Sequence, residues 1–296
     1  MDAGGSIGSF EERIVATVDG LALYARDYAP LAPVTGLPVI CLHGLTRNSR
    51  DFEIIAPRIA ALGRRVVAPD MRGRGKSAND PDPAHYVPTV YAQDVVSLLD
   101  KLEIPQAVFI GTSMGGIITM VVGMTAPGRV AATVLNDVGP KLETDGLKRI
   151  ASYVGRVRPL PSWDEAVSTA KEIAGAAYPH RDDDRDFWLA FAHRTFRQLD
   201  DGQVQADYDP HIALAFADIE HAPPADLTPL FQGLVQKPML SIRGGLSDIL
   251  TPDVVAQMRT MKPDLVAVEI PDIGHAPMLD EPGAWDALLD FLASVP

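Results

Sequence analysis

The chain has 296 residues, of which 47% are hydrophobic and 22% are charged, and its formal net charge at pH 7 is −13. This length fits one large α/β domain, or a core domain that carries a smaller insertion. The charge argues against nucleic acid and against an anionic membrane as partners, because binding to either requires clustered Lys and Arg. It also weakly disfavours strongly anionic substrates through long-range repulsion.

Cysteine content and the N-terminal segment bear on the compartment. The single cysteine, Cys41, excludes an intrachain disulfide and lies in the apolar run 37–42, so we expect a buried thiol. Residues 1–10 have neither the basic nor the apolar segment of a secretion signal, and we find no run of about 18 apolar residues. We therefore expect a cytoplasmic protein, and the sequence leaves open whether it is a monomer or a homodimer.

Apolar runs with turn signals between them predict the strands. Arg13–Val18 and Leu21–Tyr28 alternate apolar and polar residues around Asp19-Gly20, which predicts a β-hairpin. Later runs are short and almost wholly apolar, as expected for parallel strands that are covered on both faces. These runs are Pro38–Leu42, Arg65–Ala68, Ala107–Ile110, Ala132–Leu135, Pro238–Ile242 and Leu265–Ile270.

Segments with helical spacing lie between most of these strands. They are Asp51–Leu62, Val90–Leu102, Met114–Thr125, Asp253–Met261 and Ala284–Leu292. Strands that alternate with helices are typical of the α/β class, in which right-handed crossovers build a doubly wound, mostly parallel sheet.

One interval of roughly a hundred residues, between Asn136 and Pro238, contains no convincing strand and is too long for a structureless loop. Four amphipathic segments are expected to form helices there: Leu147–Arg156, Trp163–Ala177, Asp182–Leu199 and Ile212–Glu220. We predict a core of residues 1–138 and 228–296, with residues 139–227 inserted as a helical cap. The cap should lie over the carboxyl ends of the strands, where ligands bind in open α/β sheets.

The motif with the clearest chemical meaning is Gly111–Gly116, which reads Gly-Thr-Ser-Met-Gly-Gly. It follows an apolar strand and precedes an apolar helix. In that context the glycines permit a bend sharp enough to expose Ser113 Oγ at the N-terminus of the helix. We predict that Ser113 is a nucleophile.

A serine nucleophile needs a base and an acid that orients the base. His275 lies in a Gly-His-Ala-Pro turn after the strand Leu265–Ile270, and we predict that it is the base. Asp248, just past the strand Pro238–Ile242, is the expected acid. Asp137, which closes an earlier strand, is the alternative.

Two backbone N–H groups should stabilise the oxyanion. Met114 follows the nucleophile, and Leu45 lies in the loop after Pro38–Leu42, so we predict that their N–H groups form the oxyanion hole. His43 is the first residue of this loop and precedes Ser113 in the chain, and we expect it to support the loop by hydrogen bonds rather than to act as a base.

Together these motifs resemble the α/β-hydrolase superfamily. The resemblance rests on Leu42-His43-Gly44, Asp70–Ser77, Gly111–Gly116, Asp248 and Gly274-His275, and it covers roughly residues 13–138 and 228–295. The chain is similar to capped microbial esterases, lactonases and C–C bond hydrolases. The resemblance implies an eight-stranded, mostly parallel sheet, an acyl-enzyme mechanism with water as the second nucleophile, and no cofactor. Some members of the fold take their acid from the position of Asp137.

The residues around the motifs narrow the substrate class. Ser113 argues against the dehalogenases and epoxide hydrolases of this fold, which attack with a carboxylate. C–C hydrolases commonly carry Asn before the nucleophile and Trp after the histidine, whereas this chain has Thr112 and Ala276. We therefore expect a small carboxylic ester or lactone as substrate. A C–C bond hydrolase acting on a diketone and a non-catalytic small-molecule receptor are the alternatives.

Candidate substrate contacts are Arg47, Trp163, Trp188 and Phe191. Arg47 could pair with a substrate carboxylate or form a surface salt bridge, and the aromatic residues could line a pocket or form the core of the cap. We predict no metal site, because the acidic run Asp182–Asp184 lacks a calcium-loop spacing and fits the first turn of a helix.

Overall fold

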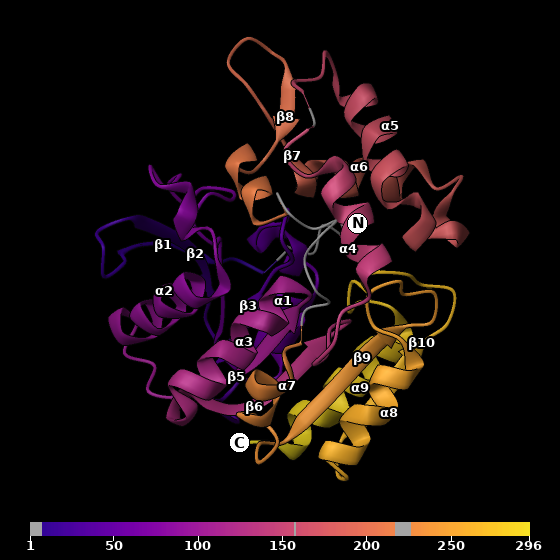
Figure 1. Ribbon diagram of the computed structural model, residues 1–296. Helices are drawn as coiled ribbons and strands as arrows, with labels where there is room; N and C mark the ends of the chain where they lie inside the picture. The colour runs from indigo at the N-terminus through magenta and orange to yellow at the C-terminus, as the bar shows by residue number, and fades with distance from the viewer. Residues whose placement is uncertain (1–7, 157, 217–225) are drawn as a thin grey trace, which may run out of the picture.

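The computed structural model describes residues 8–156, 158–216 and 226–296 (Figure 1). Eight strands form one sheet in the order β1-β2-β4-β3-β5-β6-β9-β10. The pairs β1–β2 and β2–β4 are antiparallel, and the other neighbours are parallel. The strands are β1 (Glu11–Ala16), β2 (Ala22–Tyr28), β3 (Val39–Leu42), β4 (Val66–Pro69), β5 (Ala107–Thr112), β6 (Val130–Asn136), β9 (Met239–Gly244) and β10 (Val266–Ile270). The predicted eight-stranded, mostly parallel sheet is confirmed.

Helices cover both faces of the sheet because successive strand residues point to opposite sides. In β3, Ile40 and Leu42 pack on one face with helices α2, α3 and α8, whereas Val39 and Cys41 pack on the other face with α1 and α9. The core helices are α1 (Ile55–Ala61), α2 (Pro88–Lys101), α3 (Met114–Thr125), α7 (Thr228–Gln232), α8 (Pro252–Met261) and α9 (Pro282–Ser294). Cys41 is a fully buried free thiol, as expected, and burial raises its pKa.

Short 3₁₀ helices complete the connections. They are η1 (Ser49–Phe52), η2 (Pro83–His85), η3 (Pro127–Arg129), η4 (Gly175–Ala177), η5 (Pro179–Arg181) and η6 (Pro210–Phe216). Over the described residues, no helix has both the length and the apolar character needed to cross a bilayer.

The segment between β6 and β9 contains α4 (Thr144–Tyr153), α5 (Trp163–Ala174), α6 (Arg185–Thr195), β7 (Phe196–Gln198) and β8 (Val204–Ala206). It places α5, α6, β7 and β8 at the top of the view, with α4 below them and the core helix α7 lower still (Figure 1). Asp184 caps α6 by accepting a hydrogen bond from the Phe187 N–H at 3.0 Å, so the acidic run lies just before the helix, whose first turn begins at Arg185 rather than at Asp182.

The expectation of a cap without strands was wrong. The predicted helix Asp182–Leu199 ends at Thr195, and the chain then forms an antiparallel β7–β8 hairpin around Asp200-Asp201-Gly202, where Gly202 has a φ of +84°. A positive φ at glycine favours a tight turn over a continuing helix. The predicted helix Ile212–Glu220 begins as η6, and its second half lies outside the described residues.

The two ends of this insertion lie side by side. Lys141 pairs with Asp226 in an isolated antiparallel bridge, and the Leu227 N–H donates to the Pro140 carbonyl at 2.7 Å. The chain therefore leaves the core and returns to it at neighbouring points. We propose on this basis that residues 139–227 form the cap as one inserted unit.

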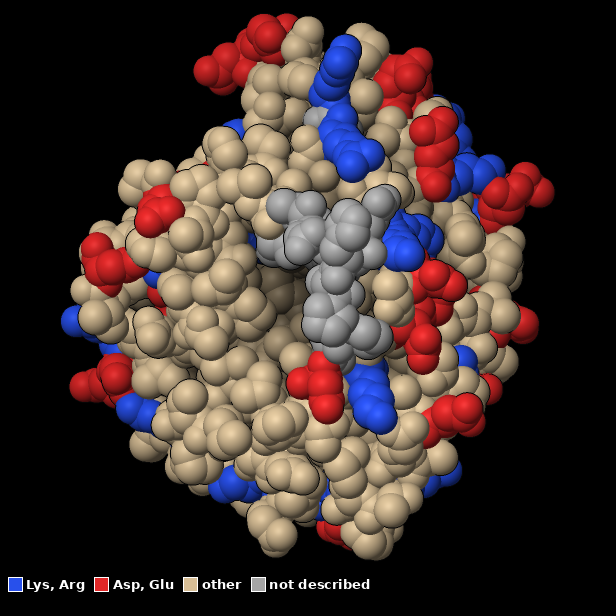
Figure 2. All heavy atoms as spheres, viewed as in Figure 1, with Lys and Arg blue, Asp and Glu red and all other residues tan. Residues whose placement is uncertain are grey.

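Charged side chains of both signs are dispersed over the face of the molecule seen in Figure 2. Figure 2 shows Lys and Arg mixed with Asp and Glu over the visible face rather than gathered into one basic patch.

Candidate active site

Ser113 lies at a sharp turn between β5 and α3, with a φ of +52°. The turn depends on glycine because side chains would collide within it. A Cβ on Gly111 would lie 2.5 Å from the backbone of Gly115, and a Cβ on Gly115 would lie 2.0 Å from the Leu42 carbonyl oxygen. Strain of this kind is maintained only where the surrounding structure enforces it, and here it exposes a serine hydroxyl at a helix N-terminus.

The structure brings Ser113, His275 and Asp137 into one chain of hydrogen bonds. Nε2 of His275 lies 2.9 Å from Ser113 Oγ, and Nδ1 of His275 lies 2.7 Å from Asp137 Oδ2. The imidazole is mostly buried and the carboxylate is fully buried. This is the arrangement in which an imidazole can remove a proton from a serine while a carboxylate fixes its tautomer.

The buried carboxylate of Asp137 has a partner for each oxygen. Oδ1 accepts a hydrogen bond from the Gly244 N–H at 2.8 Å, and Oδ2 accepts one from Ser247 Oγ at 2.6 Å besides the one from His275. Hydrogen bonds of this kind compensate the desolvation of a buried charge. They also hold the carboxylate against the imidazole.

The prediction that Asp248 is the acid partner of His275 was wrong, and the alternative, Asp137, occupies that place. Ser247 points toward Asp137, and the next residue, Asp248, instead accepts hydrogen bonds from Arg149 of α4 at 2.5 and 2.8 Å. Partial burial raises the pKa of Asp248, but the hydrogen bonds and charge of Arg149 outweigh burial and hold this pKa below its ordinary value. Asp248 therefore joins the core to the cap.

Sheet order explains why Asp137 reaches the histidine. β6 lies between β5, which leads to Ser113, and β9, which pairs with β10, the strand before His275. Asp137 directly follows the last residue of β6, whereas Asp248 lies four residues beyond the end of β9. A side chain at the end of the middle strand is therefore closer to both partners.

One predicted oxyanion donor, the Leu45 N–H, belongs to a peptide group whose orientation is fixed. The Gly44 carbonyl accepts from His43 Nδ1 at 2.7 Å and from the Arg47 N–H at 3.2 Å, and the Leu45 N–H points the opposite way because the peptide is planar and trans. Gly44 also approaches the nucleophile, since a Cβ placed on it would lie 3.9 Å from Ser113 Cβ. Within the described residues, the N–H groups of Leu45 and Met114 have no acceptor.

His43 supports this loop, as expected. Its ring is fully buried, donates from Nδ1 to the Gly44 carbonyl and accepts the Met71 N–H at Nε2 over 3.0 Å. Only a neutral ring can both donate and accept in this way. Burial lowers the pKa of His43 to about 4.

Asn136 ties the nucleophile turn to the histidine loop, and sequence reasoning gave it no role. Its Nδ2 donates to Thr112 Oγ1 at 3.0 Å and to the Pro277 carbonyl at 2.8 Å, while its backbone carbonyl accepts a hydrogen bond from the Ser113 N–H at 2.9 Å. The sequence offered only one signal for it, its place at the end of a strand next to an aspartate.

A cavity of about 130 Å³ lies between the core loops and the cap, and both Ser113 and His275 line it. Of the four predicted substrate contacts, Arg47 and Phe191 also line it. Trp163 and Trp188 do not. Trp188 is buried among the cap aromatics and donates to the Arg181 carbonyl at 2.8 Å, and Trp163 stacks on His193 with 3.8 Å between ring centroids. Both residues therefore pack within the cap and not in the cavity, Trp188 buried and Trp163 half-buried.

Arg149 lines the same cavity from the cap side, and sequence reasoning missed it. It lies on α4 one helical turn before Tyr153, another cavity residue. No sequence signal distinguished it from other arginines of an amphipathic helix, because its position depends on how the cap is seated.

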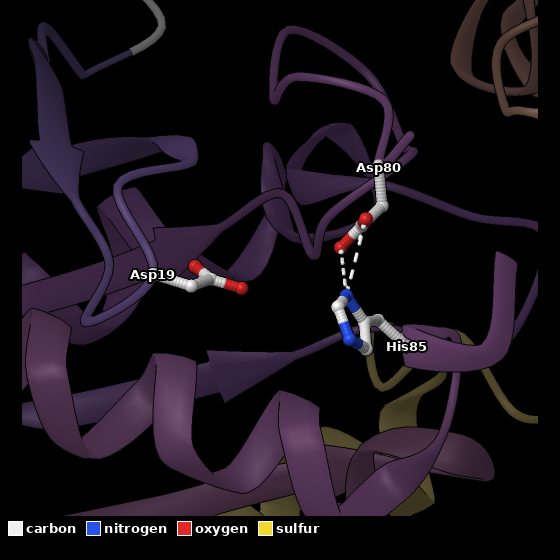
Figure 3. A group of neighbouring side chains, drawn as sticks. All are labelled: Asp19, Asp80 and His85. Atoms are coloured by element: carbon white, nitrogen blue, oxygen red, sulfur yellow. Dashed lines mark hydrogen bonds and ion pairs between the residues drawn. The ribbon is translucent and has the colours of Figure 1, made fainter. Parts of the chain in front are cut away.

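A separate group of titratable side chains, Asp19, Asp80 and His85, lies beside the β1–β2 hairpin (Figure 3). Arg72 serves as the cation among these carboxylates. It is bonded to Asp80, to Asp19 at 2.9 Å and to Asp94 at 2.7 Å. The Arg72 hydrogen bonds lower the pKa of Asp19 to about 2. The group is thus an ion-pair network that ties the hairpin to the loop after β4.

The fold and the arrangement around Ser113 are those of one class of proteins. A family model described as alpha/beta hydrolase fold matches residues 38–282, and the chain belongs to that family.

Individual relatives agree with this assignment. The chain is 32% identical over 254 residues to a 3-hydroxybutyrate-oligomer hydrolase from Cupriavidus necator, covering 84% of this chain and 86% of the relative. It is 26% identical to a 2-(acetamidomethylene)succinate hydrolase from Mesorhizobium japonicum, over 81% of this chain and 82% of the relative. Among solved structures, an alpha/beta hydrolase from Novosphingobium aromaticivorans is similar with a TM-score of 0.88 and 42% identity, covering 96% of this chain and 98% of that chain.

Proposed function

We propose that the protein is a serine hydrolase that cleaves a small carboxylic ester or lactone through an acyl-enzyme. One observation carries the proposal: a single imidazole lies within hydrogen-bond distance of both the Ser113 hydroxyl and the buried Asp137 carboxylate. A hydroxyl paired with an oriented base is the requirement for nucleophilic catalysis by serine.

In the proposed reaction, Ser113 Oγ attacks the ester carbonyl carbon while His275 Nε2 takes the hydroxyl proton. The tetrahedral oxyanion is stabilised by the N–H groups of Leu45 and Met114, and Asp137 stabilises the imidazolium through Nδ1–H. His275 then protonates the departing alcohol oxygen as the C–O bond breaks. Water attacks the acyl-serine in the second half, with His275 again taking and returning the proton.

The relatives support the ester class. The Cupriavidus relative is a 3-hydroxybutyrate-oligomer hydrolase. Oligomers of 3-hydroxybutyrate are held together by carboxylic ester bonds. No separate cofactor is required by the proposed mechanism, and we propose a small molecule, rather than nucleic acid or membrane, as the partner. We also propose a cytoplasmic location.

Labelling and turnover test the proposal together. A fluorophosphonate probe should modify Ser113 alone, as mapped by mass spectrometry, and p-nitrophenyl acetate should be hydrolysed with steady turnover. Ser113→Ala should abolish both, whereas Ser152→Ala, which changes an exposed serine of the cap, should keep both. Labelling at another residue would overturn the nucleophile assignment, and a single stoichiometric burst would favour the receptor alternative. Cleavage of a diketone with no ester turnover would favour the C–C hydrolase.

A further inference from the structure

Two arginines line the cavity, and their surroundings differ. Arg47 is fully engaged: Nε donates to both Asp51 oxygens at 2.9 and 3.0 Å, and Nη1 donates to Thr195. Its guanidinium also lies 4.2 Å from the ring centroid of Phe191. Arg47 therefore ties the loop after β3 to helix α6, which is the salt-bridge alternative rather than the carboxylate anchor.

Arg149 has fewer partners. Its Nε and Nη2 donate to Asp248 at 2.5 and 2.8 Å, and the Tyr153 hydroxyl of the same helix is its other close polar neighbour in the described part of the chain. The side chains of Arg149 and Asp248 are 34% and 39% exposed, so water reaches both partners. An ion pair that water reaches contributes little to stability, so replacing Asp248 by another carboxylate costs little.

The backbone beneath this ion pair is fixed. A Cβ on Gly146 would lie 2.3 Å from the Asp248 carbonyl oxygen, so α4 packs tightly on the loop that carries Asp248. Arg149 thus reaches the cavity from a rigid position, and displacing its side chain from Asp248 need not move the helix.

From these contacts we propose that Arg149 is a specificity residue that binds a second, free carboxylate of the substrate, displacing Asp248 as it does so. The inference rests on the proposed ester hydrolysis and defines its substrate class as esters that carry one carboxylate besides the scissile bond. Replacing one carboxylate by another keeps the guanidinium paired, and the released Asp248 becomes hydrated. Because the interaction is a direct contact, it acts at short range even though the net charge of −13 repels anions at long range.

Matched esters provide the test. The anionic series is the monoethyl esters of succinate, glutarate and adipate, and the neutral series is the ethyl esters of butyrate, pentanoate and hexanoate, all followed by proton release. Arg149→Met should lower kcat/KM for at least one anionic ester about tenfold more than for its neutral partner, mainly through KM. Arg149→Lys should recover part of the loss.

Asp248→Asn separates this role from a merely structural one. It removes the same ion pair but leaves Arg149 free, so it should lower KM for the anionic ester, the opposite of Arg149→Met. If the ion pair only fastens the cap, both variants will change both ester series alike, and the proposal is wrong.

Lys148→Met and Asp145→Asn are the charge controls, because both residues are exposed on α4. Lys148→Met changes the net charge as Arg149→Met does, and Asp145→Asn changes it as Asp248→Asn does. Equal selectivity changes in these controls would also overturn the proposal. If Ser113→Ala still hydrolyses either series, the proposed function itself fails, independently of how the Arg149 variants behave.

Discussion

His275 Nδ1 lies 2.7 Å from Asp137 Oδ2, although the two residues are separated by 138 positions in the chain. The sheet creates this proximity by placing β6 between the strand before the nucleophile and the pair of strands before the histidine. The same carboxylate accepts hydrogen bonds from the Gly244 N–H and the Ser247 hydroxyl, which hold it in place. Because the carboxylate is held, it also fixes the orientation of the imidazole.

Replacement of Asp137 should lower the catalytic rate far more than replacement of Asp248. Asp137→Asn should lower kcat for p-nitrophenyl acetate by about 10⁴-fold, because an amide cannot stabilise the imidazolium or select its tautomer. Asp248→Asn should lower kcat for this neutral ester less than about threefold. Steady-state kinetics at pH 8 measures both, and a loss in Asp248→Asn equal to that in Asp137→Asn would reverse the assignment.

Ser113 and His275 should act as one unit. Ser113→Ala and His275→Ala should each lower kcat by about 10⁴-fold or more, and the double variant should be hardly worse than either, since each change alone stops the same proton transfer. Multiplied losses in the double variant would show independent roles. Circular dichroism of all three variants controls for folding.

The nucleophile turn should tolerate no side chain at Gly115. A Cβ there would lie 2.0 Å from the Leu42 carbonyl oxygen, so Gly115→Ala should lower the free energy of unfolding by about 3 kcal/mol or prevent folding. Gly128→Ala is the matched control, because a Cβ at Gly128 meets nothing within 4 Å. Urea unfolding midpoints that shift equally in both variants would contradict this reasoning.

His43 should make stability depend on pH. Burial lowers its folded pKa to about 4, below the ordinary 6.5, so between these values the unfolded chain binds the extra proton. The resulting stabilisation is complete above about pH 6.5 and is lost as the pH falls toward 4, a change of up to about 3 kcal/mol. Urea unfolding across this range should show the decline. In the folded protein, the NMR chemical shifts of the His43 imidazole should remain those of the neutral ring down to about pH 4. A titration of this ring near pH 6.5 would show that His43 is not buried and neutral.

Cys41 should be inert in the native protein. It is fully buried in β3, and burial raises its pKa, so the reactive thiolate is disfavoured and inaccessible. Ellman's reagent should react with one thiol in denaturant and with none beforehand. Fast labelling of the native chain would place Cys41 outside the core.

The sequence predicted the features that are local. The first two strands were found from their alternation of apolar and polar residues around a turn, and the other six from short apolar runs bounded by turn residues; Met114–Thr125 matches α3 residue for residue. Ser113 and His275 were found because glycine-rich turns after strands mark functional loops. The β7–β8 hairpin was missed because its strands of three residues are too short to show alternation.

The choice between the two acids could not be made locally. Both Asp137 and Asp248 follow strands on the same edge of the sheet, and the outcome depends on the direction in which one loop turns. Ser247 takes the inward position, which leaves Asp248 facing Arg149. The position of Arg149 in the cavity could not be predicted from the sequence, because it depends on how the cap packs on the core.

If residues 139–227 form one inserted cap as proposed, the bridge between Lys141 and Asp226 implies that this cap can be exchanged as a unit. Since the chain leaves and rejoins the core at adjacent points, a tight linker of a few residues could span the excision without stretching β6 or β9. Asp137, Ser113 and His275 all lie outside the excised stretch. Replacing residues 139–227 by the cap of another family member should therefore change which substrates bind, while the distances between Ser113, His275 and Asp137 stay the same.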